Sequence, residues 1–255
     1  VLMKIALCFA GQPRYFSDNH AFWVNALQGL DVDIFVHAWY DPTVIGTKQG
    51  DPSSGTGWTV EPDSDKRIVK LYKPKKFLFE KQKVFTDEFD ELAKTYFTEE
   101  GDRIWLGTPK VFLSSMYSIK SSVGLMKQYC SENPHVKYDQ VIVTRFDFIY
   151  IKRLIDVLKK ENESFMTAYV PGEEWNTTHL NDVFLVSNYD NILEYAKHFD
   201  RWKEDLDSGI AFCPHRLRFA YLKKSGHSFE QIFTFPNYPS RKWFLNRGRG
   251  LEIYC

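Results

Sequence analysis

Short apolar runs alternate along the chain with longer segments whose apolar residues recur at helical spacing. Residues 3–9, 31–39 and 141–150 are rich in Val, Ile, Phe and Ala, and each run has the length of a buried strand. Between the first two runs, residues 17–30 carry large apolar side chains three and four positions apart, and Ser17 is suited to cap that helix. The order strand, helix, strand predicts an α/β protein with a mostly parallel, Rossmann-like sheet flanked by helices.

The same alternation continues to about residue 226. Apolar spacing predicts further strands over residues 67–80, 164–170 and 182–187, and helices over residues 87–97, 114–129, 188–206 and 213–226, the last ending at Gly226. No internal repeat and no linker divides the 255 residues, so we expect a single domain.

Residues 41–66 interrupt the pattern. They are rich in Gly, Pro, Ser, Thr and Asp, and Trp58 is the large apolar residue of note among them. A loop of this length is typically either functional or irregular. An ordered substrate loop and a floppy insertion both fit this composition.

Composition and charge exclude several partners. The 33 basic and 33 acidic residues cancel, so no overall field attracts nucleic acid or an anionic membrane. No apolar run approaches the roughly 20 residues of a membrane span. The four cysteines lie far apart without a CxxC pair, which is typical of reduced thiols. We therefore expect a soluble, cytoplasmic protein, whose 16% aromatic content favours pockets that stack flat ligands.

Polar residues follow the first two predicted strands, where ligands bind in doubly wound sheets. In "AGQPRY", Gly11 permits a close backbone approach, and Arg14 and Tyr15 are suited to a phosphate and a base. A dinucleotide fingerprint is missing, and a plain turn with a surface arginine is the alternative. In "VHAWYD", His37 and Trp39 emerge after the second strand, and a structural histidine is the alternative there.

The run "VIVTRFDFIY" carries two charges at the end of an apolar strand. Arg145 and Asp147 stand two residues apart and so on the same side of an extended chain. A carboxylate in that place can hold a divalent cation that bridges the two phosphates of a nucleotide diphosphate. A structural ion pair between Arg145 and Asp147 is the alternative.

Further polar groups occur in the second half of the chain. Residues 173–182 include Glu174 and Asp182, either of which could serve as a general base, although a capped polar loop is the alternative. His215 stands at a predicted helix start, where phosphate can bind. The C-terminal segment carries Arg241, Lys242, Arg247 and Arg249, which fit either a closing anion contact or a solvated end.

Four stretches in this order resemble a family of small glycosyltransferases with the GT-A fold, found in bacterial polysaccharide loci and in large DNA viruses of algae. They are "KIALCFAGQPR", "DVDIFVHAWYD", "SSMYSIKSSVGLMKQY" and "YDQVIVTRFDFIY", and they cover about the first 150 residues. The stretches "HLNDVFLVS" and "PHRLRFAYLKKSG" extend the resemblance weakly to about residue 225. The resemblance implies a nucleotide-binding part over about residues 1–150 and an acceptor-side part over about residues 151–255, in the host cytoplasm if the protein is viral.

The family implies transfer of a sugar from a nucleotide-diphosphate donor to a glycan hydroxyl, usually with Mn²⁺ or Mg²⁺. Carried onto this sequence, the resemblance assigns nucleotide and donor contacts to Gly11, Gln12, Arg14, Tyr15, Met116, Tyr117, Lys120, Arg145, Asp147 and His215. We add His37 and Trp39 to these contacts because of their place at the end of the second predicted strand. Arg145 occupies the first position of the usual Asp-x-Asp motif, so Asp147, with His215 as a weaker match, is the implied metal ligand, and the need for a metal is open.

The implied chemistry is displacement at the anomeric carbon with a diphosphate leaving group. An inverting enzyme needs a base, for which Asp182 comes first and Glu174 second, whereas a retaining enzyme needs none. Two other classes stay open. A nucleotidyltransferase would use a similar sheet, and a non-catalytic carbohydrate-binding module would use the many aromatic residues.

Overall fold

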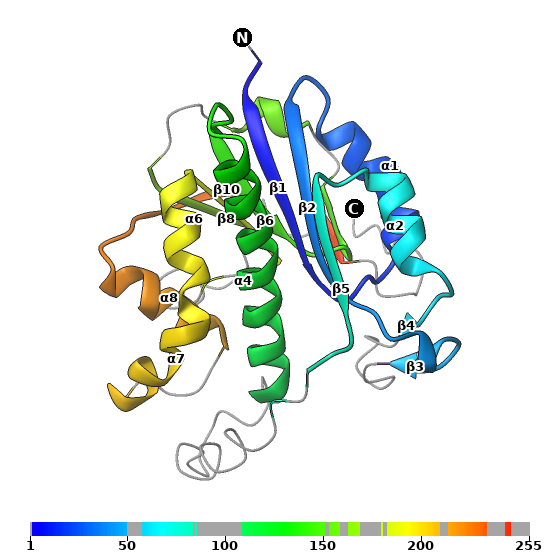
Figure 1. Ribbon diagram of the computed structural model, residues 1–255. Coiled ribbons are helices and arrows are strands. Elements are labelled where there is room, and N and C mark those ends of the chain that lie inside the picture. The colour runs from blue at the N-terminus through cyan, green and yellow to red at the C-terminus, as the bar shows by residue number, and fades with distance from the viewer. Residues whose placement is uncertain are drawn as a thin grey trace.

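A seven-stranded sheet organises the described part of the chain, with the strand order β10-β8-β9-β6-β1-β2-β5 (Figure 1). The computed structural model describes residues 2–49, 58–83, 85, 109–150, 153–158, 163–168, 180, 183–209, 214–233 and 243–245. The strands of this sheet are β1 (Lys4–Gly11), β2 (Asp31–Trp39), β5 (Lys76–Glu80), β6 (Gln140–Thr144), β8 (Phe165–Ala168), β9 (Phe184–Ser187) and β10 (Phe229–Phe233). Every neighbouring pair is parallel except the two that β9 makes with β6 and β8. The predicted α/β class with a mostly parallel sheet is confirmed.

Helices cover both faces of the sheet (Figure 1). On one face lie α4 (Pro109–Glu132), α6 (Tyr189–Ala196), α7 (His198–Asp207) and α8 (Pro214–Lys224), and on the other lie α1 (Phe16–Ala26) and α2 (Ser64–Tyr72). The side chains of strand β1 pack against the helices on both faces of the sheet. Ala6, Cys8 and Ala10 face α4, and Ile5, Leu7 and Phe9 face α1 and α2, because successive side chains of a strand point to opposite sides.

Two small sheets complete the described structure. Strand β7 (Phe148–Tyr150) pairs antiparallel with β11 (Trp243–Leu245), and β3 (Lys48–Gln49) pairs antiparallel with β4 (Trp58–Thr59). Two short 3₁₀ helices span Pro42–Val44 and Leu154–Asp156. Within the predicted 41–66 loop, the described residues therefore form a turn of 3₁₀ helix, the β3–β4 pair and the start of α2. Residues 50–57 of this loop lie outside the described residues.

The predicted strand over residues 67–80 is wrong in its first half. Residues Ser64–Tyr72 form α2, and the strand β5 begins only at Lys76. Ile68 and Tyr72, four positions apart, are buried together, and the Tyr72 hydroxyl donates to the Phe16 carbonyl oxygen of α1 at 2.7 Å. Packing against α1 therefore outweighs the strand propensity of Ile68 and its neighbours.

The first helix also differs at both ends from the prediction. It begins at Phe16, after Tyr15 in a left-handed backbone conformation, and Ser17 does not cap it. The Ser17 hydroxyl instead accepts a hydrogen bond from Arg67 of α2 at 3.1 Å. The helix ends at Ala26, and Gly29 turns the chain into β2 with a φ of 83°.

The apolar run 141–150 is two strands rather than one. Strand β6 ends at Thr144, the chain turns over residues 145–147, and β7 then joins a different sheet. The turn is fixed because the Phe146 ring stacks on Phe9 with centroids 4.7 Å apart, and because Asn19 of α1 donates to the Phe146 carbonyl oxygen at 2.8 Å. Arg145 and Asp147 therefore project from a turn at the end of a buried strand.

Two further expectations concern the rest of the chain. No helix among the described residues has the length and apolar character to cross a membrane. Cys8 and Cys130 carry free thiols, as expected, and burial raises the pKa of the Cys8 thiol. The predicted helix over residues 87–97, together with Cys213 and Cys255, lies outside the described residues.

Candidate functional site

The strand order reverses direction at β1. The chain passes from β1 to β2 on one side and later returns to β6 on the other side of β1, so β1 and β6 flank a topological switch point. In open α/β sheets, ligands bind beyond the carboxyl ends of the strands at such a point. The carboxyl ends of β1, β2, β5 and β6 all lie at one edge, because these four strands are mutually parallel.

Three predicted residues meet at this switch point, and we call Arg14, Arg145 and Asp147 the arginine–aspartate cluster. Arg145 faces Asp147 in a bidentate pair, in which Nε donates to Oδ1 at 2.8 Å and Nη2 donates to Oδ2 at 2.5 Å. The Arg14 Nη1 atom lies 3.8 Å from the Asp147 Oδ2 atom. Segments that are about 130 residues apart in sequence thus combine their charges, since Arg14 follows β1 and the other two follow β6.

The arginine–aspartate cluster is largely shielded from solvent and carries more positive than negative charge. The Asp147 side chain is 7% exposed, and those of Arg14 and Arg145 are 23% and 30% exposed. Burial lowers the pKa of the Arg14 guanidinium; Asp147 opposes this effect and Arg145 adds to it. The Arg14 Nε atom is buried and has no hydrogen-bond partner among the described residues. The three side chains of the cluster together carry a charge of +1, which favours an anion.

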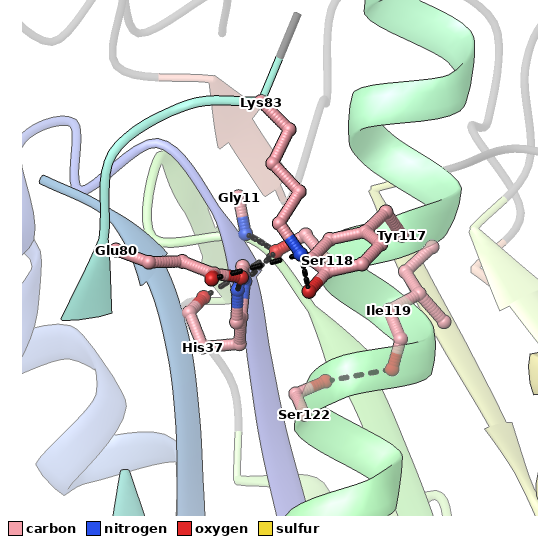
Figure 2. A network of polar contacts seen from close by, with 8 residues as sticks. All are labelled: Gly11, His37, Glu80, Lys83, Tyr117, Ser118, Ile119 and Ser122. Carbon is pink, nitrogen blue, oxygen red and sulfur yellow. Dashed lines mark hydrogen bonds and ion pairs between the residues drawn. The ribbon is translucent and has the colours of Figure 1, made fainter. Parts of the chain in front are cut away.

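A second group of polar contacts joins the ends of β1, β2 and β5 to α4 (Figure 2). The Gly11 backbone N–H donates to the Ser118 hydroxyl oxygen at 2.6 Å, and that oxygen lies 2.6 Å from His37 Nδ1. His37 Nε2 lies 3.0 Å from the Glu80 Oε1 atom. Gly11 has a φ of 108°, in the region that favours glycine, so the chain can leave β1 at the angle that this contact needs. We call these four residues the histidine relay.

Chemistry assigns the protons of the histidine relay. The Glu80 carboxylate accepts, so His37 Nε2 donates to it, and the neutral ring then accepts from the Ser118 hydroxyl at Nδ1. Burial lowers the pKa of His37, against the opposing effect of Glu80, and so favours this neutral ring. Burial would raise the pKa of Glu80, but the hydrogen bonds from His37 and Tyr117 and the charge of Lys83 lower it on balance.

Aromatic rings lie beside the histidine relay. Trp39 and Tyr117 stack with centroids 5.4 Å apart and an interplanar angle of 23°, and His37 meets Trp39 edge to face at 4.8 Å. The Lys83 ammonium lies 3.9 Å from the centroid of the Tyr117 ring and is hydrogen-bonded to its hydroxyl (Figure 2). Trp39 is buried, whereas Tyr117 is partly exposed although Trp39, Lys83 and Phe199 pack against its ring.

The turn after β1 is tied to its neighbours by side-chain amides. Gln12 donates to the Gln82 side-chain oxygen at 2.5 Å, and Gln82 donates to the Ser114 hydroxyl of α4 at 3.1 Å. Tyr15 ends the turn as the residue before α1, and burial raises the pKa of its hydroxyl. The predicted residues of "AGQPRY" thus line one described edge, although each has its own contacts.

Three other predicted residues have contacts elsewhere. Met116 is fully buried, and its sulfur accepts from Arg218 of α8 at 3.2 Å. Lys120 pairs with Asp200 of α7 at 2.6 Å on the outer side of α4. His215 Nδ1 lies 2.9 Å from the Leu180 carbonyl oxygen. Their assignment to the donor site therefore stays a prediction from the resemblance.

The two predicted bases, Glu174 and Asp182, lie outside the described residues, as do the four basic residues of the C-terminal segment. Their roles stay predictions as well.

The described donors do not fit the Mn²⁺ or Mg²⁺ that the resemblance implies. Both cations prefer several oxygen ligands in a near-octahedral arrangement. Both carboxylate oxygens of Asp147 instead accept from Arg145, and a second guanidinium stands beside them. Within the described ranges, no three His, Cys, Asp or Glu side chains gather in a group that could hold a metal ion.

Sequence reasoning missed three contributors to the site, namely Ser118, Glu80 and Lys83. Glu80 could have been identified from the sequence, because it ends the apolar strand "KFLFE" and so lies at the same edge of the sheet as His37. Ser118 gave no signal, since one serine among several on a helix is ordinary until the packing shows which one faces β1.

Comparisons with known proteins add no assignment. No protein-family model matches the chain, and no curated protein is significantly similar to it. The chemistry of the site therefore has to be argued from its own residues.

Proposed function

We propose that the protein transfers a sugar from a nucleotide-diphosphate donor to a hydroxyl group of a glycan acceptor. The arginine–aspartate cluster at the switch point between β1 and β6 carries this proposal. A partly buried group with a net positive charge in that place suits the diphosphate of a nucleotide sugar. The GT-A fold implied by the resemblance is compatible with an open sheet that is parallel around the switch point.

The edge beside the cluster supports the same donor. In this proposal a nucleobase contacts the exposed part of the Tyr117 ring of α4, which stacks on the buried Trp39 at the end of β2. The histidine relay holds the Gly11 turn against α4, so the backbone between the cluster and the aromatic pair has a defined position. A nucleotide lying along this edge would place its base at the aromatic pair and its phosphates at the cluster.

In the proposed reaction, the acceptor oxygen forms a bond to the anomeric carbon while the bond from that carbon to the β-phosphate oxygen breaks. The bonding pair leaves with the nucleoside diphosphate, whose added negative charge Arg14 and Arg145 stabilise. The acceptor proton goes to a carboxylate such as Asp182 or Glu174 in an inverting reaction. In a retaining reaction it goes to an oxygen of the departing phosphate.

A thermal-shift panel tests the proposal against its two rivals. We expect UDP, GDP or CDP, or one of their sugars, to raise the unfolding temperature. A ligand at one hundred times its Kd adds about 2.7 kcal/mol to the free energy of unfolding. Stabilisation by nucleoside triphosphates alone favours a nucleotidyltransferase, and stabilisation by oligosaccharides alone favours a carbohydrate-binding module. If no nucleoside diphosphate stabilises the protein, the proposal is wrong.

A further inference from the structure

We infer that the diphosphate of the donor binds directly to the guanidinium groups of Arg14 and Arg145, without a bridging divalent cation, and that Asp147 positions these two arginines. The inference rests on the proposed function and names the means by which that site holds its anionic ligand. It differs from the resemblance, which gives Asp147 the role of a metal ligand.

The geometry of the Arg145–Asp147 pair is the first reason. A guanidinium has five N–H donors in a planar fork, and Arg145 presents Nε and Nη2 to the two oxygens of one carboxylate. A metal ion at Asp147 would have to displace both of these charge-assisted hydrogen bonds at a side chain that is only 7% exposed. Asp147 is therefore already engaged by a cation of the protein itself.

The charge of the surroundings is the second reason. A divalent cation at Asp147 would stand beside two guanidinium groups, since Arg14 Nη1 also lies 3.8 Å from Oδ2. In a partly buried site this repulsion is large, whereas a diphosphate is attracted by the same two groups. The burial of Arg14 strengthens the preference, because a desolvated cation gains more from a nearby anion than an exposed one.

The way in which the chain builds the cluster is the third reason. Arg14 is fixed by the turn after β1, and Arg145 and Asp147 are fixed by the turn that Phe146 anchors in the core. Asp147 holds Arg145 in one bidentate orientation, so the guanidinium group is ordered before a ligand arrives. Such preorganisation is what a protein needs when guanidinium groups take the place of a metal.

Isothermal titration calorimetry on the full chain provides the test. UDP, GDP, CDP and ADP are titrated first in EDTA and then in MnCl₂ or MgCl₂, and inorganic pyrophosphate serves as a probe without a base. We expect the best-binding nucleoside diphosphate to bind in EDTA with a Kd within about threefold of that in Mn²⁺.

Three variants test which side chains bind the nucleoside diphosphate. Arg145→Gln and Arg14→Gln should each weaken that nucleoside diphosphate in EDTA by roughly tenfold or more, because each removes a charged donor. Asp147→Asn distinguishes the two roles of the carboxylate. If Asp147 is a positioning residue, the affinity for the nucleoside diphosphate in EDTA should become no more than about threefold weaker, or even stronger, because the net charge of the cluster rises. A metal ligand would instead lose the Mn²⁺-dependent affinity.

Arg153→Gln is the matched control. Arg153 is an exposed arginine that pairs with Asp156. The neighbouring Ile155 lies close to Gly29, just before the amino end of β2, so Arg153 is at the opposite edge of the sheet from the cluster. Its replacement should leave the affinity unchanged. The unfolding temperature of each free variant, compared with that of the wild type, separates loss of binding from loss of folding.

The outcomes separate this inference from the proposed function. Binding of a nucleoside diphosphate in EDTA that depends on Arg14 and Arg145 supports both. Binding only in Mn²⁺ or Mg²⁺, lost in Asp147→Asn, overturns the inference and leaves the proposed function standing. Absence of binding under every condition overturns the proposed function, and the inference with it.

Discussion

Arg145 and Asp147 were recognisable in the sequence because charges inside an apolar run are costly unless they are paired or used. The sequence offered an ion pair and a metal ligand as alternatives, and the structure shows the pair, with Arg14 as its third member. The excess of positive charge and its place at the switch point are what favour an anion site.

The residue scale also yields a prediction for Ser118. Its hydroxyl serves Gly11 and His37 at once, and the side chain is fully buried. Ser118→Ala should therefore lower the free energy of unfolding by about 1–3 kcal/mol, because the His37 ring nitrogen and the Gly11 N–H both lose their partner. Denaturation in urea, followed by circular dichroism, measures the change.

Ser122→Ala is the matched control for Ser118→Ala. Ser122 is equally buried on the same helix, but its hydroxyl only donates to the Ile119 carbonyl oxygen of that helix at 3.1 Å (Figure 2). The change should stay within about 0.5 kcal/mol, since alanine also favours the helix. Equal effects of the two substitutions would show that the contacts of Ser118 contribute nothing of their own.

At the scale of elements, patterning predicted the inner strands well and the segment before β5 poorly. The β1 and β2 runs are mostly apolar in their centres, which suits strands covered on both faces. The segment "RIVKLY" contains the β-branched residues Ile68 and Val69 and the aromatic residue Tyr72, which favour a strand. The helix forms because Ile68 and Tyr72 bury their side chains together below α1, and a single sequence does not show that neighbour.

This correction makes a prediction about α2. In a strand, positions 68 and 70 would share one face, whereas in the helix they do not. Ile68→Ala should therefore lower the free energy of unfolding by about 2–5 kcal/mol, and Lys70→Ala should change it by less than about 0.5 kcal/mol. Urea denaturation compares the two variants, and similar losses at both positions would contradict the helix.

At the scale of the whole molecule, two buried imidazoles should link stability to pH. Burial lowers the pKa of His37, against Glu80, and also lowers that of His198, against Asp205. As the pH falls, the two histidines therefore bind protons near pH 6.5 in the unfolded chain and only at a lower pH in the folded chain. The stabilisation is complete above pH 6.5 and is lost as the pH falls below it, towards the lower pKa values of the folded state.

We therefore expect the free energy of unfolding to decrease between pH 7.5 and pH 5.5, with a limiting slope of roughly 1.4 kcal/mol per pH unit for each histidine. Urea denaturation at half-unit steps of pH measures this slope. His37→Gln should reduce the slope even where it lowers stability at every pH. A slope that is flat in the wild type would contradict the neutral, buried state of both rings.

The sequence by itself determined the α/β class, the inner strands, the long helix that became α4 and the polar strand ends, because these depend on the period of apolar residues and on local turn chemistry. Only the tertiary structure decided that Arg14 meets Asp147, that Ser118 joins Gly11 to His37, and that Phe146 splits one apolar run into two strands. Each of these contacts joins segments that lie far apart in the chain. Their pairing is set by strand order and core packing, which have no period in the sequence.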